Sequence, residues 1–156
     1  MRLKKYFLIA LGVMLFFPFV NAAEPFTRDI EDARLQTLTS DLHPAVYLVE
    51  SAMKVYGDNP VVLFVDAESV QMLTQEQGVF EEIELISFKV TSEKDESAKI
   101  DVSQLNGFTN LKYILVTYEY DACGGGDACL DKKVDAIITM PADNDVEVYY
   151  LLSVPQ

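Results

Sequence analysis

The chain is short of the residue types on which most catalytic and metal sites depend. Its 156 residues include one histidine and two cysteines. A Ser–His or Cys–His mechanism would have to use His43 as its base, and His43 directly precedes Pro44 at an expected helix start. No serine lies in a Gly-x-Ser-x-Gly context, and one histidine with two oxidised cysteines offers too few zinc ligands. We therefore predict no catalytic residue, no metal site and no cofactor.

Basic residues are also scarce. The chain has 12 Lys and Arg against 25 Asp and Glu, a net charge of −13. Three of the basic residues lie in the first 22 positions, so a chain starting at residue 23 has 9 against 25, or −16. Nucleic acid and anionic lipid surfaces both attract basic proteins, so we predict neither as a partner. The acidity indicates solubility outside the cytoplasm. The more specific alternatives are that the acidic surface binds a basic protein partner or divalent cations.

Only one long apolar run is present, and it stands at the N-terminus over residues 6–20. A basic head precedes it, made of Arg2, Lys4 and Lys5, and compact residues follow at Val20-Asn21-Ala22. This layout is typical of a secretory signal peptide. The run is shorter than the ~20 residues that span a bilayer, and Pro18 interrupts its end. We predict a signal peptide over 1–22 and one domain over 23–156. The protein is then exported to the periplasm or the medium, with no stable membrane insertion. The alternative is that 1–22 stays uncleaved and anchors the protein in the membrane.

The two cysteines, Cys123 and Cys129, both follow the expected cleavage site. An even number of cysteines in an exported chain indicates a disulfide. The loop between them contains three glycines, Gly124 to Gly126, and lies between two expected strands. We therefore predict a disulfide that holds the end of a hairpin rather than a redox pair, since Cys-x-x-Cys spacing is absent.

Apolar spacing predicts two helices before the strands begin. Residues 27–38 can form a modest helix with Thr27 as its N-cap. Residues 43–56 show a stronger three- and four-residue repeat, with Pro44 in the first turn and Gly57 after the last. A third, short helix is expected after Asp66, with Val70 and Leu73 on its inner face.

The remaining pattern has the period of strands. Runs rich in β-branched and aromatic residues predict strands at 61–65, 84–91, 111–120, 134–140 and 146–154, with a brief pairing at 100–102. We expect an α+β fold in which N-terminal helices pack on a curved, mainly antiparallel sheet. The order of elements resembles the cone-shaped nuclear-transport-factor-2-like and cystatin-like arrangements, with no motif behind the resemblance.

A short leucine-rich-repeat-like solenoid is the alternative fold. The spacing of one such repeat is matched by Leu105, Phe108, Leu111, Ile114 and Val116. Earlier strands of a solenoid could then lie at Leu63–Val65 and Ile83–Leu85. The intervals are irregular, no Asn follows Val116, and at least three repeats are normally needed.

Tyrosines concentrate on the C-terminal strands. If Tyr118, Tyr120 and Tyr149 share an exposed face, they form a contact patch for a ligand or partner. We expect a small non-enzymatic binding or protein-interaction module that binds an unknown protein or small ligand. The alternatives are a carboxylate-dependent hydrolase and a weak binder of divalent cations such as calcium, through the acidic stretches 121–131 and 143–147.

Overall fold

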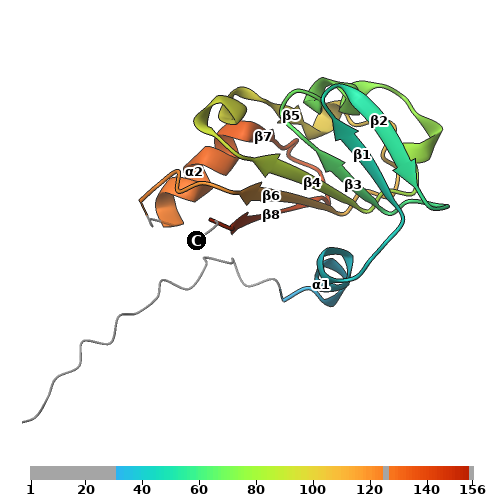
Figure 1. The fold of residues 1–156 in the computed structure, drawn as a ribbon, viewed down its shortest axis with the longest axis horizontal. Coiled ribbons are helices and arrows are strands. Elements are labelled where there is room, and N and C mark those ends of the chain that lie inside the picture. The colour runs from blue at the N-terminus through green and yellow to red at the C-terminus, as the bar shows by residue number, and fades with distance from the viewer. Residues whose placement is uncertain (1–30, 125–126, 155–156) are drawn as a thin grey trace, which may run out of the picture.

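The computed structural model describes residues 31–124 and 127–154. Its main feature is a six-stranded sheet in the order β2-β1-β3-β4-β6-β8 (Figure 1). The strands are β1 (Ala45–Val49), β2 (Ala52–Tyr56), β3 (Val62–Val65), β4 (Leu85–Val90), β6 (Tyr113–Tyr118) and β8 (Glu147–Leu152). β1 and β2 form an antiparallel hairpin, and every other neighbouring pair is parallel.

Helices and short turns connect the strands. The helices are α1 (Ala33–Ser40) and α2 (Asp127–Ile137), with the 3₁₀ helices η1 (Val70–Thr74), η2 (Gly78–Phe80), η3 (Glu93–Ser97) and η4 (Val102–Gln104). A second, two-stranded parallel sheet joins β5 (Ile100–Asp101) to β7 (Ile138–Thr139). No helix within the described ranges is long and apolar enough to cross a membrane.

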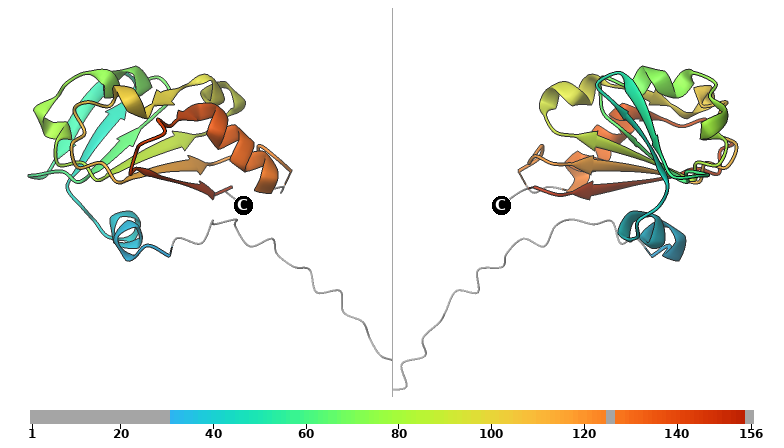
Figure 2. Two further views of the ribbon diagram at one scale, coloured as in Figure 1. Left: turned by 180° about the vertical axis from the view of Figure 1, so that it is seen from behind. Right: turned by 45° about the vertical axis from the view of Figure 1, so that its right-hand side comes forward.

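Side chains alternate between the two faces of the main sheet. On β4, Ile86, Phe88 and Val90 are fully buried on one side, which we call the core face. The connections after β3, β4 and β6 pack on this face, and the largest apolar cluster lies between them and the sheet. The opposite side, which we call the open face, is covered at one end by α1 (Figure 2).

The expected antiparallel meander is wrong, and so is the cone-shaped arrangement built on it: the fold is a mixed α/β one with a mostly parallel sheet. The residues that pair across successive parallel strands are Ala45, Val62, Leu85, Tyr113 and Glu147. The number of residues from one strand to the next therefore grows from 17 to 34 along the chain. Such intervals leave room for the crossover connections that parallel strands require. The strand positions at 61–65, 84–91, 111–120 and 146–154 are confirmed; their direction of pairing is not.

The helix expected at 43–56 is also wrong, because this segment forms the β1–β2 hairpin. Val46 and Leu48 are buried on the core face, while Tyr47 and Val49 point the other way and are exposed. Glu50 and Ser51 have φ angles of 53° and 59°, as a two-residue hairpin turn of the primed type requires. Because β1 pairs parallel with β3, this segment forms strands with a two-residue period instead of a helix.

Two further elements differ from expectation. Most of 134–140 belongs to α2, which buries Leu130, Val134 and Ile137 at helical spacing, and only Ile138–Thr139 is strand. The first helix begins at Ala33, with Asp32 as its N-cap accepting from the amides of Arg34 and Leu35. The expected cap Thr27 lies outside the described residues. N-terminal helices therefore do not form the layer that was expected.

The disulfide between Cys123 and Cys129 is present, with a Cα–Cα distance of 5.8 Å. It joins the segment after β6 to the first turns of α2 instead of closing a hairpin. Leu130 follows Cys129 directly and is buried in the core cluster. The disulfide therefore ties the start of α2 to the sheet that this helix covers.

Replacing Cys123 and Cys129 together by serine should lower the free energy of unfolding by about 2 kcal/mol, the loop-closure value for a short loop. Urea titration of both forms measures this difference, and intact mass of the parent chain should be two hydrogens below that of the dithiol. An unchanged urea midpoint would contradict a stabilising role for this bond.

Candidate functional site

α1 covers the first row of side chains on the open face, and its apolar cluster reaches Leu115 in the second row. Leu35 and Leu38 of α1 are almost completely buried there. They form a second apolar cluster with residues from four strands, including Ala45, Val62, Leu85, Tyr113 and Leu115. This helix does not extend over the β2 end of the second row, where Tyr47 and Phe64 stay exposed.

An ion-pair network attaches α1 to the sheet. Arg34 donates to Glu84 through Nη2 at 2.5 Å and Nε at 3.1 Å, and Lys112 Nζ donates to the same carboxylate at 3.0 Å. The hydrogen bonds from Arg34, and after them Lys112, lower the pKa of Glu84 from 4.5 to about 2. Glu84 immediately precedes β4, so this network fixes the position of α1 over the first row.

At the β2 end of the open face, three aromatic side chains lie together, and we call them the aromatic row. Tyr47 on β1 stacks on Phe64 of β3, with ring centroids 4.9 Å apart and planes 20° from parallel. Tyr56 of β2 meets Tyr47 edge-on at 5.4 Å. Tyr47 and Phe64 are each 37% exposed and Tyr56 is 57% exposed. The aromatic row therefore presents a large apolar surface to solvent at the β2 end of the sheet.

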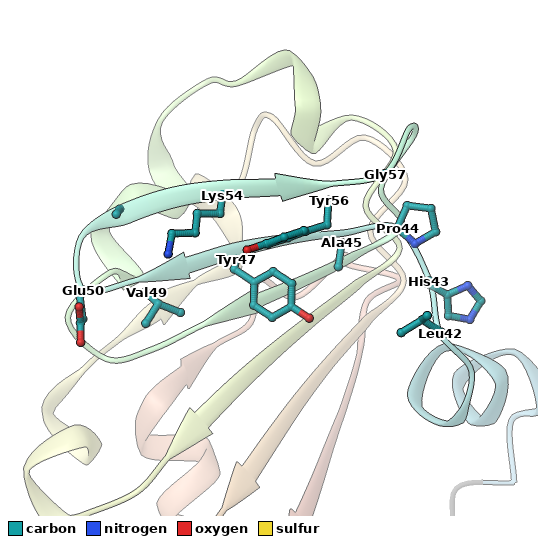
Figure 3. Close-up of a pocket in the computed structure, with 11 residues that line it drawn as sticks. Leu42, His43, Pro44, Ala45, Tyr47, Val49, Glu50, Lys54, Tyr56 and Gly57 are labelled. Carbon is teal, nitrogen blue, oxygen red and sulfur yellow. The ribbon is translucent and has the colours of Figure 1, made fainter.

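A cleft of about 820 Å³ lies over this part of the sheet. Figure 3 shows Leu42, His43 and Pro44 at one end, Val49 and Glu50 at the hairpin turn, and Lys54 with Tyr56 along β2. The lining is mostly apolar, and Lys54 is the one lysine or arginine that the described lining contains. Concave, mainly apolar surfaces with a few polar groups are typical binding sites.

The hairpin beside the cleft is held in place by hydrogen bonds from the end of β3. Asp66 accepts from the amide of Glu50 at 2.8 Å and from that of Ser69 at 2.9 Å. The hydroxyl of Ser69, a fully buried residue, accepts from the amide of Ser51 at 3.0 Å. The two turn residues with positive φ are therefore anchored, which gives β2 a fixed position although all its residues are exposed.

The three tyrosines predicted as a contact patch do not share a face. Tyr118 is fully buried on the core face, and burial raises the pKa of its hydroxyl. Tyr120 packs against the same core, and its hydroxyl donates to Glu96. Tyr149 lies on the opposite side of the sheet, beside Leu115 of β6. The condition for that patch, a common exposed face, is not met.

A smaller cavity of about 470 Å³ lies against α2 and includes Glu96, Lys132 and Lys133. Lys133 Nζ donates to both carboxylate oxygens of Glu96, at 2.8 and 2.7 Å. Burial acts to raise the pKa of Glu96, but the hydrogen bonds from Lys133 and Tyr120 outweigh it and the net shift is downward. A carboxyl group that acts as a general acid needs a raised pKa instead.

Among the described residues, His43 and the acidic stretches are not grouped into a reaction or metal site. His43 Nε2 lies 3.0 Å from the carbonyl oxygen of Thr37, so it joins α1 to the start of β1. Asn144 accepts from the amide of Val146, as in a polar turn. Within 31–124 and 127–154, no three His, Cys, Asp or Glu side chains are placed to share a metal ion.

Comparison with protein-family models, with curated proteins and with solved structures finds no match to this chain. The candidate site therefore stands on its own geometry. The sequence reasoning missed Tyr47, Tyr56 and Phe64, which form its aromatic row. The signal was the alternation in 45–49 and 52–56 on either side of Glu50-Ser51, which gives one face of a hairpin.

Glu84→Gln should lower the free energy of unfolding by about 1–2 kcal/mol near neutral pH, because it removes the charge that holds Arg34 and Lys112. The pKa of Glu84 is depressed by folding, so this stabilisation is present above about pH 4.5 and is lost as the pH falls toward 2. Urea titrations at several pH values measure the difference. Glu81→Gln is the control, and an equal loss in both variants would contradict the assigned role.

Asp66→Ala should loosen the hairpin turn, because the amide of Glu50 loses its acceptor and the amide of Ser69 keeps only the backbone carbonyl of residue 66. We expect a loss of about 1–2 kcal/mol in stability and faster amide exchange at Glu50. Asp58→Ala, in the exposed turn after β2, is the control. Unchanged exchange at Glu50 in Asp66→Ala would show that the turn does not depend on this carboxylate.

Proposed function

We propose that the protein is an exported, non-enzymatic binding module whose open face takes an apolar segment of a partner protein. The observation that carries this proposal is the distribution of exposed apolar side chains. Of the nine large hydrophobic residues that are exposed within 31–124 and 127–154, five lie on or beside the cleft: Leu42, Tyr47, Val49, Tyr56 and Phe64. Contiguous exposed apolar surface of this kind marks interaction sites in soluble proteins.

The chemistry of the cleft favours a protein segment as its occupant. Aromatic residues contribute large contact area and are enriched at protein interfaces, whereas charged residues are depleted at interface centres. Tyr47, which lines the cleft and stacks on Phe64, forms such a centre, and Lys54 and Glu50 lie at its border (Figure 3). An aliphatic or aromatic side chain of the partner would pack on the rings, and a carboxylate next to it would meet Lys54.

The arrangement of strands supports a solenoid-like interpretation of the fold. Each parallel strand pairs with the next one in the chain, so the sheet grows in one direction as successive turns of a repeat protein do. Leu105, Phe108, Ile114 and Val116, which match the leucine-rich-repeat spacing, are buried on the core side. The open face would then correspond to the ligand-binding face of a short leucine-rich-repeat-like solenoid.

Export is part of the same proposal. The N-terminal sequence has the composition of a signal peptide, and the Cys123–Cys129 disulfide is compatible with an oxidising compartment. A net charge of −13, or −16 without residues 1–22, favours solubility at the concentrations an exported binding protein meets.

The hydrolase alternative gains no support from the carboxylates. Every described carboxyl group with a resolved shift has its pKa lowered, namely Asp32, Glu84, Asp95, Glu96 and Asp101. A carboxylic acid that donates a proton near neutral pH needs a raised pKa. The binding proposal is therefore the one that the geometry favours.

The test compares capture of envelope and medium proteins by the immobilised parent chain and by Tyr47→Ser/Tyr56→Ser. We expect specific partners to be retained by the parent and lost, by roughly tenfold or more, with the double variant. Met140→Ser/Val154→Ser is the control, since these residues are 37% and 44% exposed elsewhere on the molecule. Equal capture by all three proteins would overturn the proposal.

A further inference from the structure

The outermost strand, β2, is exposed on both of its faces. Lys54 and Tyr56 project on the open face, while Met53 and Val55 project on the core face. Met53 and Val55 are 40% and 46% exposed, so the connections that cover the core face stop short of β2. A ligand in the cleft would not cover these two side chains, because they lie on the other side of the sheet.

The free edge of β2 also carries backbone groups that point outward. The carbonyl of Leu48 accepts from the amide of Asp66 on the β3 side, so it points away from β2. Leu48 is paired with Met53, and this pair is therefore a non-hydrogen-bonded one. By the same alternation, the N–H and C=O groups of Met53 and Val55 point away from β1, toward the space where a further strand would pair.

Natural proteins usually protect such an edge with a proline, a bulge, a charged side chain such as lysine, or a covering segment. Within the described structure the one such device on β2 is Lys54: the pairing of β2 with β1 is continuous over five residues, and its sequence has no proline. Its one charge, on Lys54, lies over the cleft (Figure 3). The hydrogen bonds of Asp66 and Ser69 meanwhile hold the hairpin in a defined position.

Charge indicates which kind of strand can approach this edge. β2 itself, residues 52–56, contains no acid and one lysine, Lys54, in a chain of net charge −13; Glu50 and Asp58 lie just beyond its two ends. Two strongly acidic copies of the chain repel one another over most of their surfaces. The five residues of β2 therefore bring no acidic group of their own into a contact between two copies.

The two ends of the sheet are not equivalent. At the other end, among 147–154, Val154 is the one large hydrophobic residue that is exposed. A head-to-tail contact between the β2 edge and the β8 edge would therefore leave Met53 and Val55 against a surface with little apolar area. A symmetric contact places the same two side chains of each copy together, and it closes at two subunits.

We propose that two copies of the chain pair antiparallel through their β2 edges, which joins the two six-stranded sheets into one. The outward groups of Met53 and Val55 form the new ladder, and their side chains pack against the partner copy on the core face. A two-fold axis at Lys54 would oppose two like charges, so the axis lies at a neighbouring residue. The two open faces then form one continuous surface with the two clefts at its centre.

The test is sedimentation velocity of the purified chain over a range of concentrations and salt. We expect a monomer–dimer equilibrium that shifts toward the dimer as salt rises, because screening weakens repulsion between the acidic copies. Val55→Lys should weaken dimerisation by roughly tenfold or more. Val154→Lys is the matched control, with the same change in net charge at a side chain that is 44% exposed, against 46% for Val55.

Circular dichroism and thermal melts establish that both variants are folded, and Met53→Lys repeats the test at the second edge residue. Dimers retained in Val154→Lys and lost in Val55→Lys and Met53→Lys would support the proposal. A monomer at every concentration and salt would overturn it. So would a dimer that survives both edge variants, or one that Val154→Lys disrupts equally.

Discussion

Parallel pairing in chain order is the constraint on which the rest of this structure depends. Each strand from β1 to β8 in the main sheet, apart from β2, lies parallel to the next, so every connection must return across the sheet before the following strand begins. The connections after β3, β4 and β6 all pack on the core face, where they bury Leu73, Phe80, Ile100 and Val134. The open face receives α1 alone among the described elements, and its aromatic row stays exposed as a consequence.

This asymmetry links the fold to the proposed binding role. The core face supplies most of the hydrophobic burial, and α1 buries part of the open face. The side chains at the β2 end of the open face therefore remain available for recognition. Arg34 and Glu84 keep α1 over the first row, and Asp66 with Ser69 keeps the hairpin beside the second. The cleft between these two anchors is a preorganised surface, which reduces the entropy lost when a partner binds.

The sequence predicted strand positions well where one period was dominant. In 84–91 the alternation of Ile86, Phe88 and Val90 admits one interpretation, and the structure buries all three. In 43–56 the apolar residues fit a helix and a hairpin equally, and pairing with β3 decides between them. Parallel order and the position of Tyr118 on the core face depend on contacts between distant segments, which no local pattern contains. The aromatic site was missed for a different reason: the alternation that signals its hairpin competes with a helical spacing of the same residues.

Residue-resolved amide exchange of the β2 strand tests the central claim most directly, because it reports both the strand order and the free edge. At low concentration, the amides of Ala52, Lys54 and Tyr56, which point toward β1, should exchange slowly, and those of Met53 and Val55 should exchange rapidly. Raising the concentration should slow the second set. Uniform protection along 52–56, or rapid exchange at all five positions, would contradict the account.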